Sequence, residues 1–188
     1  MAIYDIIVIG CSMGGLAALE ELLSELSFDF SVPIVVVQHI SPDSENYMVT
    51  LLNEHCALQV QEVDEKERLR PGVVYIAPPN FHVLLEKDKS CTLSVDEKVN
   101  FSRPSIDVLF ETAAYCCGNK AVGIVLTGGN KDGAEGLKKI KKAGGLTIVQ
   151  DPGEAEVCIM PEMAITIANP DFVLTLKQIA VMLNHLNT

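Results

Sequence analysis

The amino-acid sequence predicts an α/β fold with a doubly wound, mostly parallel sheet, helices on both of its faces, and a small antiparallel section near residues 58–95. Two observations favour this fold. Short, almost entirely apolar runs alternate along the chain with segments whose apolar residues recur at helical spacing. Strands that are apolar on both sides are typical of a parallel sheet covered by helices. The length of 188 residues and the 48% hydrophobic content fit a single globular domain over 1–188.

The first half of the chain is expected to contain two strand–helix units followed by short strands. The apolar run Ile6-Ile7-Val8-Ile9 marks a strand over 3–9, and leucines at helical spacing mark a helix near 14–26. A strand over 33–38 and a helix over 44–55, entered through Ser41-Pro42-Asp43-Ser44, form the second unit. Turn residues then separate short strands, expected to be an antiparallel insertion or edge, near 58–63, 73–77, 82–86 and 91–95.

The second half continues the alternation. Pro104 is expected to open a helix that runs to residue 117 and is capped near Ser102 or Arg103, because proline fits the first turn of a helix. An apolar strand over 122–126 leads through a glycine-rich loop to a helix that ends at Gly144-Gly145. The remaining predicted elements are a strand over 146–149, a short helix opened by Pro161, a short strand over 172–174 and a C-terminal helix over 175–186.

Composition narrows the classes of function. A net charge of −11 argues against a nucleic-acid surface, because such surfaces need clustered lysine and arginine. No apolar run approaches the ~20 residues that span a bilayer, and no signal peptide is apparent at the N-terminus, so membrane insertion is not expected. We therefore expect a cytoplasmic protein.

The cysteines are expected to be buried free thiols in a reducing compartment rather than metal ligands. They show neither a C-x-x-C pair nor zinc-ligand spacing, and neither a metal nor a cofactor is expected. The six are Cys11, Cys56, Cys91, Cys116, Cys117 and Cys158.

A small-residue turn, Gly10-Cys11-Ser12-Met13-Gly14-Gly15, directly follows the first apolar run. Its G-x-S-x-G pattern suits a sharp strand-to-helix turn that exposes the Ser12 hydroxyl beside backbone N–H groups at a helix N-terminus. The dinucleotide-binding pattern G-x-G-x-x-G and the Walker ending Gly-Lys-Ser/Thr are both absent. From this turn alone, a nucleophilic serine, a phosphate cradle and a plain structural turn all remain open.

Polar residues follow three of the predicted strands. Ser12 follows the first strand, His39 follows the second, and Asp132 lies in the loop after the strand over 122–126. Because sites in parallel sheets form beyond the carboxyl ends of the strands, these side chains are expected to converge into a Ser-His-Asp set. Each also has a structural alternative, respectively a small turn residue, a strand-capping histidine and a helix N-cap.

Six motifs follow one another along the chain, and they are Gly10-Cys11-Ser12-Met13-Gly14-Gly15, Gln38-His39, Tyr75-Ile76-Ala77-Pro78, Arg103-Pro104-Ser105-Ile106-Asp107, Leu126-Thr127-Gly128-Gly129-Asn130-Lys131-Asp132-Gly133-Ala134-Glu135-Gly136 and Met160-Pro161. They recur in this order in the catalytic domain of the chemotaxis protein-glutamate methylesterases (the CheB type), and the chain resembles that family over essentially its whole length. The resemblance implies that Ser12, His39 and Asp132 form a catalytic triad.

The resemblance also implies a substrate and partners. The substrate would be a glutamate γ-methyl ester on the helical cytoplasmic region of a bacterial chemoreceptor, hydrolysed to glutamate and methanol. Some members of the family also deamidate receptor glutamines. A methyl-accepting chemotaxis protein is thus the expected partner, and a separate receiver or methyltransferase protein is a further candidate.

Several departures from the family pattern concern the site. Met13 stands where the family usually has Thr or Ala, which keeps the backbone N–H and makes the pocket bulkier. Gly128-Gly129-Asn130 replaces the family's Gly-Met-Gly, so Gly129 would supply an oxyanion N–H beside that of Met13. Ser102 stands where many members carry a histidine, and His82, at a position often histidine, either lines the cleft or is a satisfied surface residue. The receiver domain of many members is absent, so the chain is expected to be free-standing or cut from a longer one.

Two alternatives to a receptor methylesterase stay open. The first is an esterase or amidase of the same fold on another substrate, which the departures at Met13 and Ser102 favour. The second is a signalling adaptor that binds receptors without turnover, which has no need of all three residues of the triad.

Overall fold

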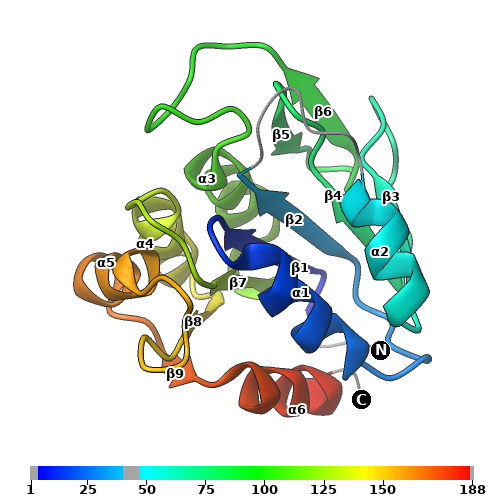
Figure 1. The fold of residues 1–188 in the computed structure, drawn as a ribbon. Helices are drawn as coiled ribbons and strands as arrows, with labels where there is room; N and C mark the ends of the chain where they lie inside the picture. The colour runs from blue at the N-terminus through cyan, green and yellow to red at the C-terminus, as the bar shows by residue number, and fades with distance from the viewer. Residues whose placement is uncertain (1–3, 40–46, 187–188) are drawn as a thin grey trace.

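The computed structural model describes residues 4–39 and 47–186, and both segments belong to one layered α/β fold (Figure 1). The main sheet has the strand order β3-β4-β2-β1-β7-β8-β9, and each pair of neighbours is parallel. Its strands are β1 (Ile6–Cys11), β2 (Ile34–Gln38), β3 (Gln59–Glu62), β4 (Val73–Ile76), β7 (Ala121–Val125), β8 (Leu146–Gln150) and β9 (Phe172–Leu174). A separate antiparallel pair consists of β5 (His82–Leu85) and β6 (Cys91–Ser94).

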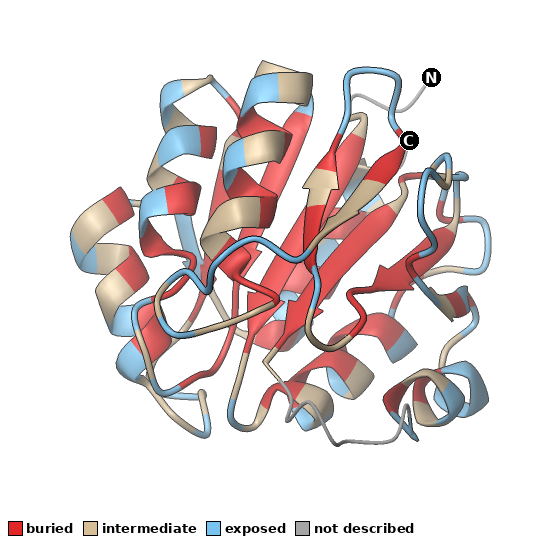
Figure 2. Cartoon of the chain, turned by 90° about the horizontal axis from the view of Figure 1, so that it is seen from above, coloured by how far each residue is buried: buried red, intermediate tan, exposed pale blue. Residues whose placement is uncertain are grey.

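Helices cover both faces of the main sheet. One layer contains α1 (Gly15–Ser24), α2 (Tyr47–His55) and α6 (Leu176–Leu186), and the other contains α3 (Ile106–Cys117), α4 (Ala134–Lys142) and α5 (Ile159–Ala168). A short 3₁₀ helix (Gly118–Lys120) links α3 to β7. Figure 2 shows the central strands of the sheet almost wholly buried between these layers, whereas the edge strands β3 and β9 are partly exposed.

The central strand β1 explains why the sheet is apolar on both sides. Ile7 and Ile9 pack into the core beneath α1 and α6, whereas Ile6 and Val8 pack into the core beneath α3 and α4. This alternation follows from the twofold repeat of a strand. All six residues of β1 are buried, and burying one such aliphatic side chain contributes about 1.5–3 kcal/mol.

The predicted antiparallel section near 58–95 is confirmed, but it is narrower than that range. Only β5 and β6 are antiparallel, whereas β3 and β4 join the parallel sheet beside β2. Short strands carry no periodic signal that distinguishes a parallel from an antiparallel neighbour. The helix predicted over 44–55 is α2, and its predicted entrance, Ser41-Pro42-Asp43-Ser44, lies outside the described residues.

The start of α3 differs from the prediction. The helix begins at Ile106 after an N-cap at Ser105, so Pro104 precedes the helix, and neither Ser102 nor Arg103 is its cap. The side chain of Ser105 makes no cap hydrogen bond, and the first N–H groups of the helix bond instead to the carboxylate of Asp132. A cap supplied by a distant residue leaves no local sequence signal.

The strand β1 also continues two residues beyond its predicted end. Gly10 therefore lies in the strand, where an added Cβ would come within 2.2 Å of Ile106 Cγ2. The glycine is needed there because α3 packs closely on the strand. The turn itself depends on Gly14, which has a φ of 77°.

The cysteines are free thiols, as predicted, but only Cys11 and Cys91 are fully buried. In the parts of the chain that the structure describes, none of the helices combines the length and the apolar character needed to cross a membrane.

Candidate active site

The three predicted site residues lie at one edge of the sheet, beyond the carboxyl ends of adjacent strands. In the parallel pair of β1 and β2, Cys11 is opposite Gln38, so Ser12 and His39 follow paired residues. The strand β7 lies on the other side of β1, and the loop that follows it carries Asp132. Parallel topology therefore places all three side chains at the same edge, as in other open α/β sheets.

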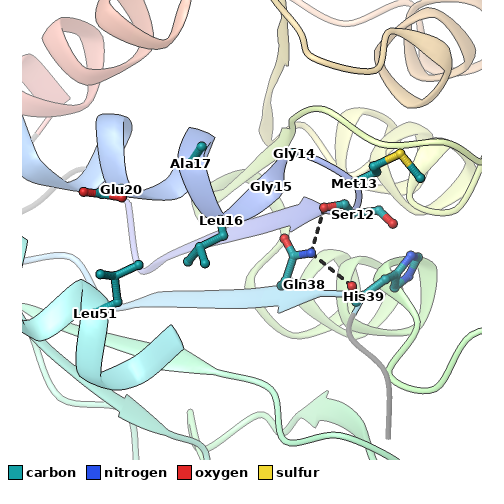
Figure 3. Close-up of a pocket in the computed structure, with 10 residues that line it drawn as sticks. All are labelled: Ser12, Met13, Gly14, Gly15, Leu16, Ala17, Glu20, Gln38, His39 and Leu51. Carbon is teal, nitrogen blue, oxygen red and sulfur yellow. Dashed lines mark hydrogen bonds between the residues drawn. The ribbon is translucent and has the colours of Figure 1, made fainter. Parts of the chain in front are cut away.

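Ser12 lies at the apex of the turn between β1 and α1 and is partly exposed. Its backbone N–H donates to Thr127 O (3.0 Å), which ties the turn to the end of β7. Gly128 lies so close to the turn that an added Cβ would come within 3.0 Å of Ser12 Cβ. Figure 3 shows the Ser12 hydroxyl directed toward the His39 ring, although no hydrogen bond joins these side chains among the described residues.

Gln38 fixes the ends of β1 and β2 relative to each other. Its Nε2 donates to the backbone oxygens of Ser12 (2.7 Å) and His39 (3.0 Å), as Figure 3 shows. Its Oε1 accepts from the thiol of Cys11 (3.0 Å). Burial raises the pKa of this thiol far above its ordinary value, so Cys11 stays protonated and does not compete with Ser12 as a nucleophile. The role of Gln38 leaves no signal in the sequence, because its contacts depend on strand register.

The imidazole of His39 is held through Nε2, which lies 2.9 Å from Asp132 Oδ2. An ionised carboxylate only accepts hydrogen bonds, so Nε2 carries the proton in the neutral ring and Nδ1 carries the lone pair. Asn130 Nδ2 lies 3.5 Å from that Nδ1, and Asn130 Oδ1 accepts from the backbone N–H of Asp132 (2.9 Å). Asn130 thus helps to fix the loop that carries Asp132.

Asp132 is fully buried and accepts hydrogen bonds on both of its oxygens. Burial alone would raise the pKa of its carboxyl group, but the donors that surround it hold the pKa below its ordinary value. The carboxylate is therefore charged throughout the neutral pH range. The donors, with their distances, are His39 Nε2 (2.9 Å), Asn100 Nδ2 (2.8 Å), Ser105 Oγ (2.8 Å), the Ile106 N–H (2.7 Å) and the Asp107 N–H (3.2 Å).

The alternative interpretation of Asp132 as the N-cap of the helix that follows it is wrong. The N-cap of α4 is Gly133, whose φ of 96° suits glycine, and no side chain caps that helix locally. Two aspartates instead cap the start of each other's helices. Asp132, in the loop before α4, accepts hydrogen bonds from the first N–H groups of α3. Asp107, in the first turn of α3, accepts hydrogen bonds from the Gly133 N–H (3.0 Å) and the Gly136 N–H (2.6 Å) at the start of α4.

Asn100 joins the two carboxylates. Its Nδ2 donates to Asp107 Oδ2 and to Asp132 Oδ1, each at 2.8 Å. Burial, together with the nearby charge of Asp132, raises the pKa of Asp107. The amide thus offsets the repulsion between two like charges and helps to fix Asp132, to which His39 is bonded. Neither Asn100 nor Asp107 was a predicted site residue, and only their packing brings them to Asp132.

Two backbone N–H groups beside Ser12 have no acceptor among the described residues. They belong to Met13 and Gly129, the residues predicted as oxyanion donors, and both residues are exposed. Neighbouring N–H groups are occupied, since Ser12 N donates to Thr127 O and Gly128 N donates to Val157 O. Free donors at the end of a strand and the start of a helix are suited to stabilise a negative oxygen.

An open hollow of about 620 Å³ borders the turn, and Ser12, Met13 and His39 are among the residues that line it. A smaller hollow of about 140 Å³ also borders His39, and Phe101, Ser102 and Arg103 contribute to its wall. Within residues 4–39 and 47–186, no group of three or more His, Cys, Asp or Glu side chains is arranged to hold a metal ion.

His82 is neither a cleft residue nor a surface residue, contrary to both interpretations of the sequence. It is 2% exposed and is the first residue of β5, from which its side chain reaches the start of α3. Its Nδ1 accepts from the Ser105 N–H (3.1 Å), so Nε2 donates to Glu97 O (3.0 Å). It holds the segment that leads into α3.

Comparisons with known proteins show what the chain is similar to. The family model described as CheB methylesterase matches residues 7–183. A protein of Leptospira interrogans (strain Fiocruz L1-130), named putative protein-glutamate methylesterase/protein-glutamine glutaminase, is 51% identical over 177 residues, which cover 94% of this chain and 92% of that protein. The protein-glutamate methylesterase/protein-glutamine glutaminase of Paraburkholderia xenovorans is 38% identical over 178 residues, and the match covers 93% of this chain and 49% of that protein.

A solved structure extends the likeness to the fold. The crystal structure of the Thermotoga maritima CheB methylesterase catalytic domain superposes with a TM-score of 0.93 at 35% sequence identity. The superposition covers 97% of this chain and 98% of that one.

Proposed function

Since the chain belongs to the CheB methylesterase family, we propose that it hydrolyses glutamate γ-methyl esters on protein chains with Ser12 as nucleophile, His39 as general base and Asp132 as the residue that orients His39. The observation that carries the proposal is the hydrogen bond between His39 Nε2 and Asp132 Oδ2 (2.9 Å), with the Ser12 hydroxyl directed at the same ring. We treat residues 1–188 as one catalytic domain.

The proposed reaction has two halves. Ser12 Oγ attacks the ester carbonyl while its proton passes to His39 Nδ1, and the N–H groups of Met13 and Gly129 stabilise the negative oxygen of the tetrahedral intermediate. The C–OCH₃ bond then breaks, and the imidazolium returns the proton to the departing methoxide, so methanol leaves. Water attacks the acyl-enzyme with the same proton transfers, which releases protein glutamate and free Ser12. Asp132 stabilises the imidazolium throughout.

The same machinery accounts for a glutaminase activity, which the names of the relatives include. A glutamine side chain presents the same acyl group with an amine as leaving group. His39 would protonate that nitrogen, and ammonia would leave in place of methanol. Both substrates end as glutamate on the protein.

We place the substrate on the cytoplasmic part of a methylated chemoreceptor, because the methyl ester of a protein glutamate is the group removed by enzymes of this name. The openness of the hollow beside Ser12 supports a macromolecular substrate, since a side chain carried on another protein must enter from the surface. A separate receiver or methyltransferase protein is a proposed further partner.

A fluorophosphonate probe separates this proposal from a phosphate-binding turn and from a non-catalytic adaptor. The activated serine of a hydrolase displaces the leaving group from phosphorus, whereas an ordinary serine hydroxyl does not. We expect the native protein to be labelled on the peptide that contains Ser12, and the heat-denatured protein to remain unlabelled. A native protein that stays unlabelled would contradict the serine mechanism.

Activity should rise with pH and then reach a plateau, because only the neutral imidazole of His39 accepts the Ser12 proton. Asp132 adds no second change of activity near neutral pH, since its lowered pKa keeps the carboxylate ionised there. Initial rates between about pH 5 and 9, at a temperature where the protein stays folded, check this, and a flat profile between about pH 5 and 8 would exclude histidine as the base.

A further inference from the structure

The connection between β6 and α3 contains a tight turn with an unusual residue. Figure 1 shows this connection as the long green loop that arches over the molecule before entering α3. Val99 N donates to Ser102 O (3.1 Å), and Ser102 N donates to Val99 O (2.9 Å), so Asn100 and Phe101 are the two central residues of the turn. Both have positive φ, 50° at Asn100 and 64° at Phe101.

The two central residues differ in how well they suit this backbone. Asparagine adopts the left-handed region more readily than most residues, whereas a bulky aromatic residue there is an outlier. Packing does not compensate for the strain, because the Phe101 side chain is 97% exposed. Backbone strain of this kind persists where the surrounding structure enforces it, and it concentrates at functional sites.

The turn is held from both ends. The side chain of Asn100 bonds to Asp107 and to Asp132, and Arg103 Nη1 donates to Val95 O (2.7 Å) and Asp96 O (3.0 Å). The backbone of Phe101 is therefore held at a fixed position relative to the carboxylate that bonds to His39. An aromatic side chain has only two rotatable bonds, so it loses little conformational entropy when it is buried against a partner.

Phe101 and Met13 line two separate hollows, and His39 borders both of them. The smaller hollow has His39 and Phe101 in its wall, and the larger hollow has Ser12, Met13 and His39. Met13 is 63% exposed, so each of the two hollows that border His39 has an accessible apolar side chain in its wall. When a glutamate methyl ester reaches Ser12, the backbone and the neighbouring side chains of the protein that carries it come against the surface around the two hollows.

We infer that Phe101 is a docking residue for the protein substrate and is buried against an apolar side chain of the receptor segment that carries the esterified glutamate. The inference rests on the proposed function. The aromatic ring contributes to recognition of the polypeptide and takes no part in the chemistry, since the reacting groups are held by hydrogen bonds that do not involve its side chain. A small ester, which has no receptor segment, does not use it.

The test is the substitution Phe101→Asn, measured on two substrates. Because asparagine tolerates positive φ, the thermal midpoint of the variant should equal or exceed that of the wild type. The ratio of kcat/KM on a methylated chemoreceptor fragment to kcat/KM on a small activated ester should fall about tenfold or more, as for an aromatic residue at the centre of an interface. The variant Phe101→Tyr keeps the ring and should keep the wild-type ratio.

The matched control is Phe28→Asn. Phe28 is 85% exposed and lies in the connection from α1 to β2, at the opposite end of the parallel strands from Ser12, so its substitution should leave the ratio unchanged. An unchanged ratio in Phe101→Asn, an equal fall on both substrates, or a lower thermal midpoint would each overturn the inference while wild-type demethylation stands. A wild-type protein that releases no methanol from the receptor would contradict the proposed function itself, and the inference with it.

Discussion

Replacing Ser12 with alanine should lower the rate of methyl-ester hydrolysis by about 10⁴-fold or more, as in other enzymes that lose a nucleophilic serine. The fold should be unaffected, because the hydrogen bonds that Ser12 makes in the described structure use its backbone. Its backbone N–H donates to Thr127 O, and its backbone carbonyl oxygen accepts from Gln38 Nε2. Alanine keeps both of these backbone groups. Release of labelled methanol from a methylated receptor measures the rate, and thermal unfolding measures the stability.

Ser24→Ala is the matched control for this variant. Ser24 lies at the end of α1, and within the described residues its hydroxyl donates only to the carbonyl of the preceding turn, Glu21 O (3.1 Å), so its loss should leave turnover unchanged. Comparable turnover by wild type and Ser12→Ala would remove Ser12 from the mechanism.

Replacing Asp132 with asparagine should lower turnover by about 10⁴-fold, by analogy with the effect of this change in the Ser-His-Asp proteases. The amide carries no charge to stabilise the imidazolium. The side-chain amide of asparagine also has one oxygen where the carboxylate has two, so one of the two acceptor positions is replaced by an NH₂ group. In one orientation this NH₂ group faces the donors His39 and Ile106. In the other orientation it faces the donors Asn100 and Asp107. This variant, unlike Ser12→Ala, should also be less stable, since a buried donor left unpaired costs about 1–3 kcal/mol.

Asp107→Asn separates the loss of activity from the loss of stability. It makes the same chemical change in the same buried network, and its contacts, on Gly133, Gly136 and Asn100, do not include His39. We expect it to lower the thermal midpoint and to lower turnover far less than Asp132→Asn, by about tenfold at most. Rates measured well below both thermal midpoints make the comparison fair. Near-normal turnover in Asp132→Asn, or equal losses in the two variants, would contradict the proposed role of Asp132.

The fold and the family were predictable because their signals are local. Uninterrupted apolar runs such as Val122-Gly123-Ile124-Val125-Leu126 mark strands buried on both faces, and the comparisons confirm the resemblance that the ordered motifs indicated. Parallel strands then bring Ser12 and His39 to one edge, since each follows the end of a central strand. These inferences need only short segments and the direction of the strands.

The surroundings of the site were not predictable, because they depend on how distant segments pack. Asn100, Asp107 and Asp132 meet only when α3 and α4 are packed side by side, and no periodicity links residues 25 or 32 positions apart. Gln38 was visible in the sequence as the last residue of a strand, but its bonds to two backbone oxygens depend on the register of β1 and β2. The positive φ of Phe101 was likewise hidden, because aromatic residues do not usually mark such turns.

Mass spectrometry of a methylated chemoreceptor from the same cell, before and after incubation with the protein, tests the central claim most directly. The account predicts that receptor peptides bearing a glutamate methyl ester are converted to the corresponding glutamate peptides, and that Ser12→Ala leaves them methylated. If the receptor peptides keep their methyl groups while the protein hydrolyses a small ester, the enzyme acts on another substrate and the assignment to receptor demethylation is wrong.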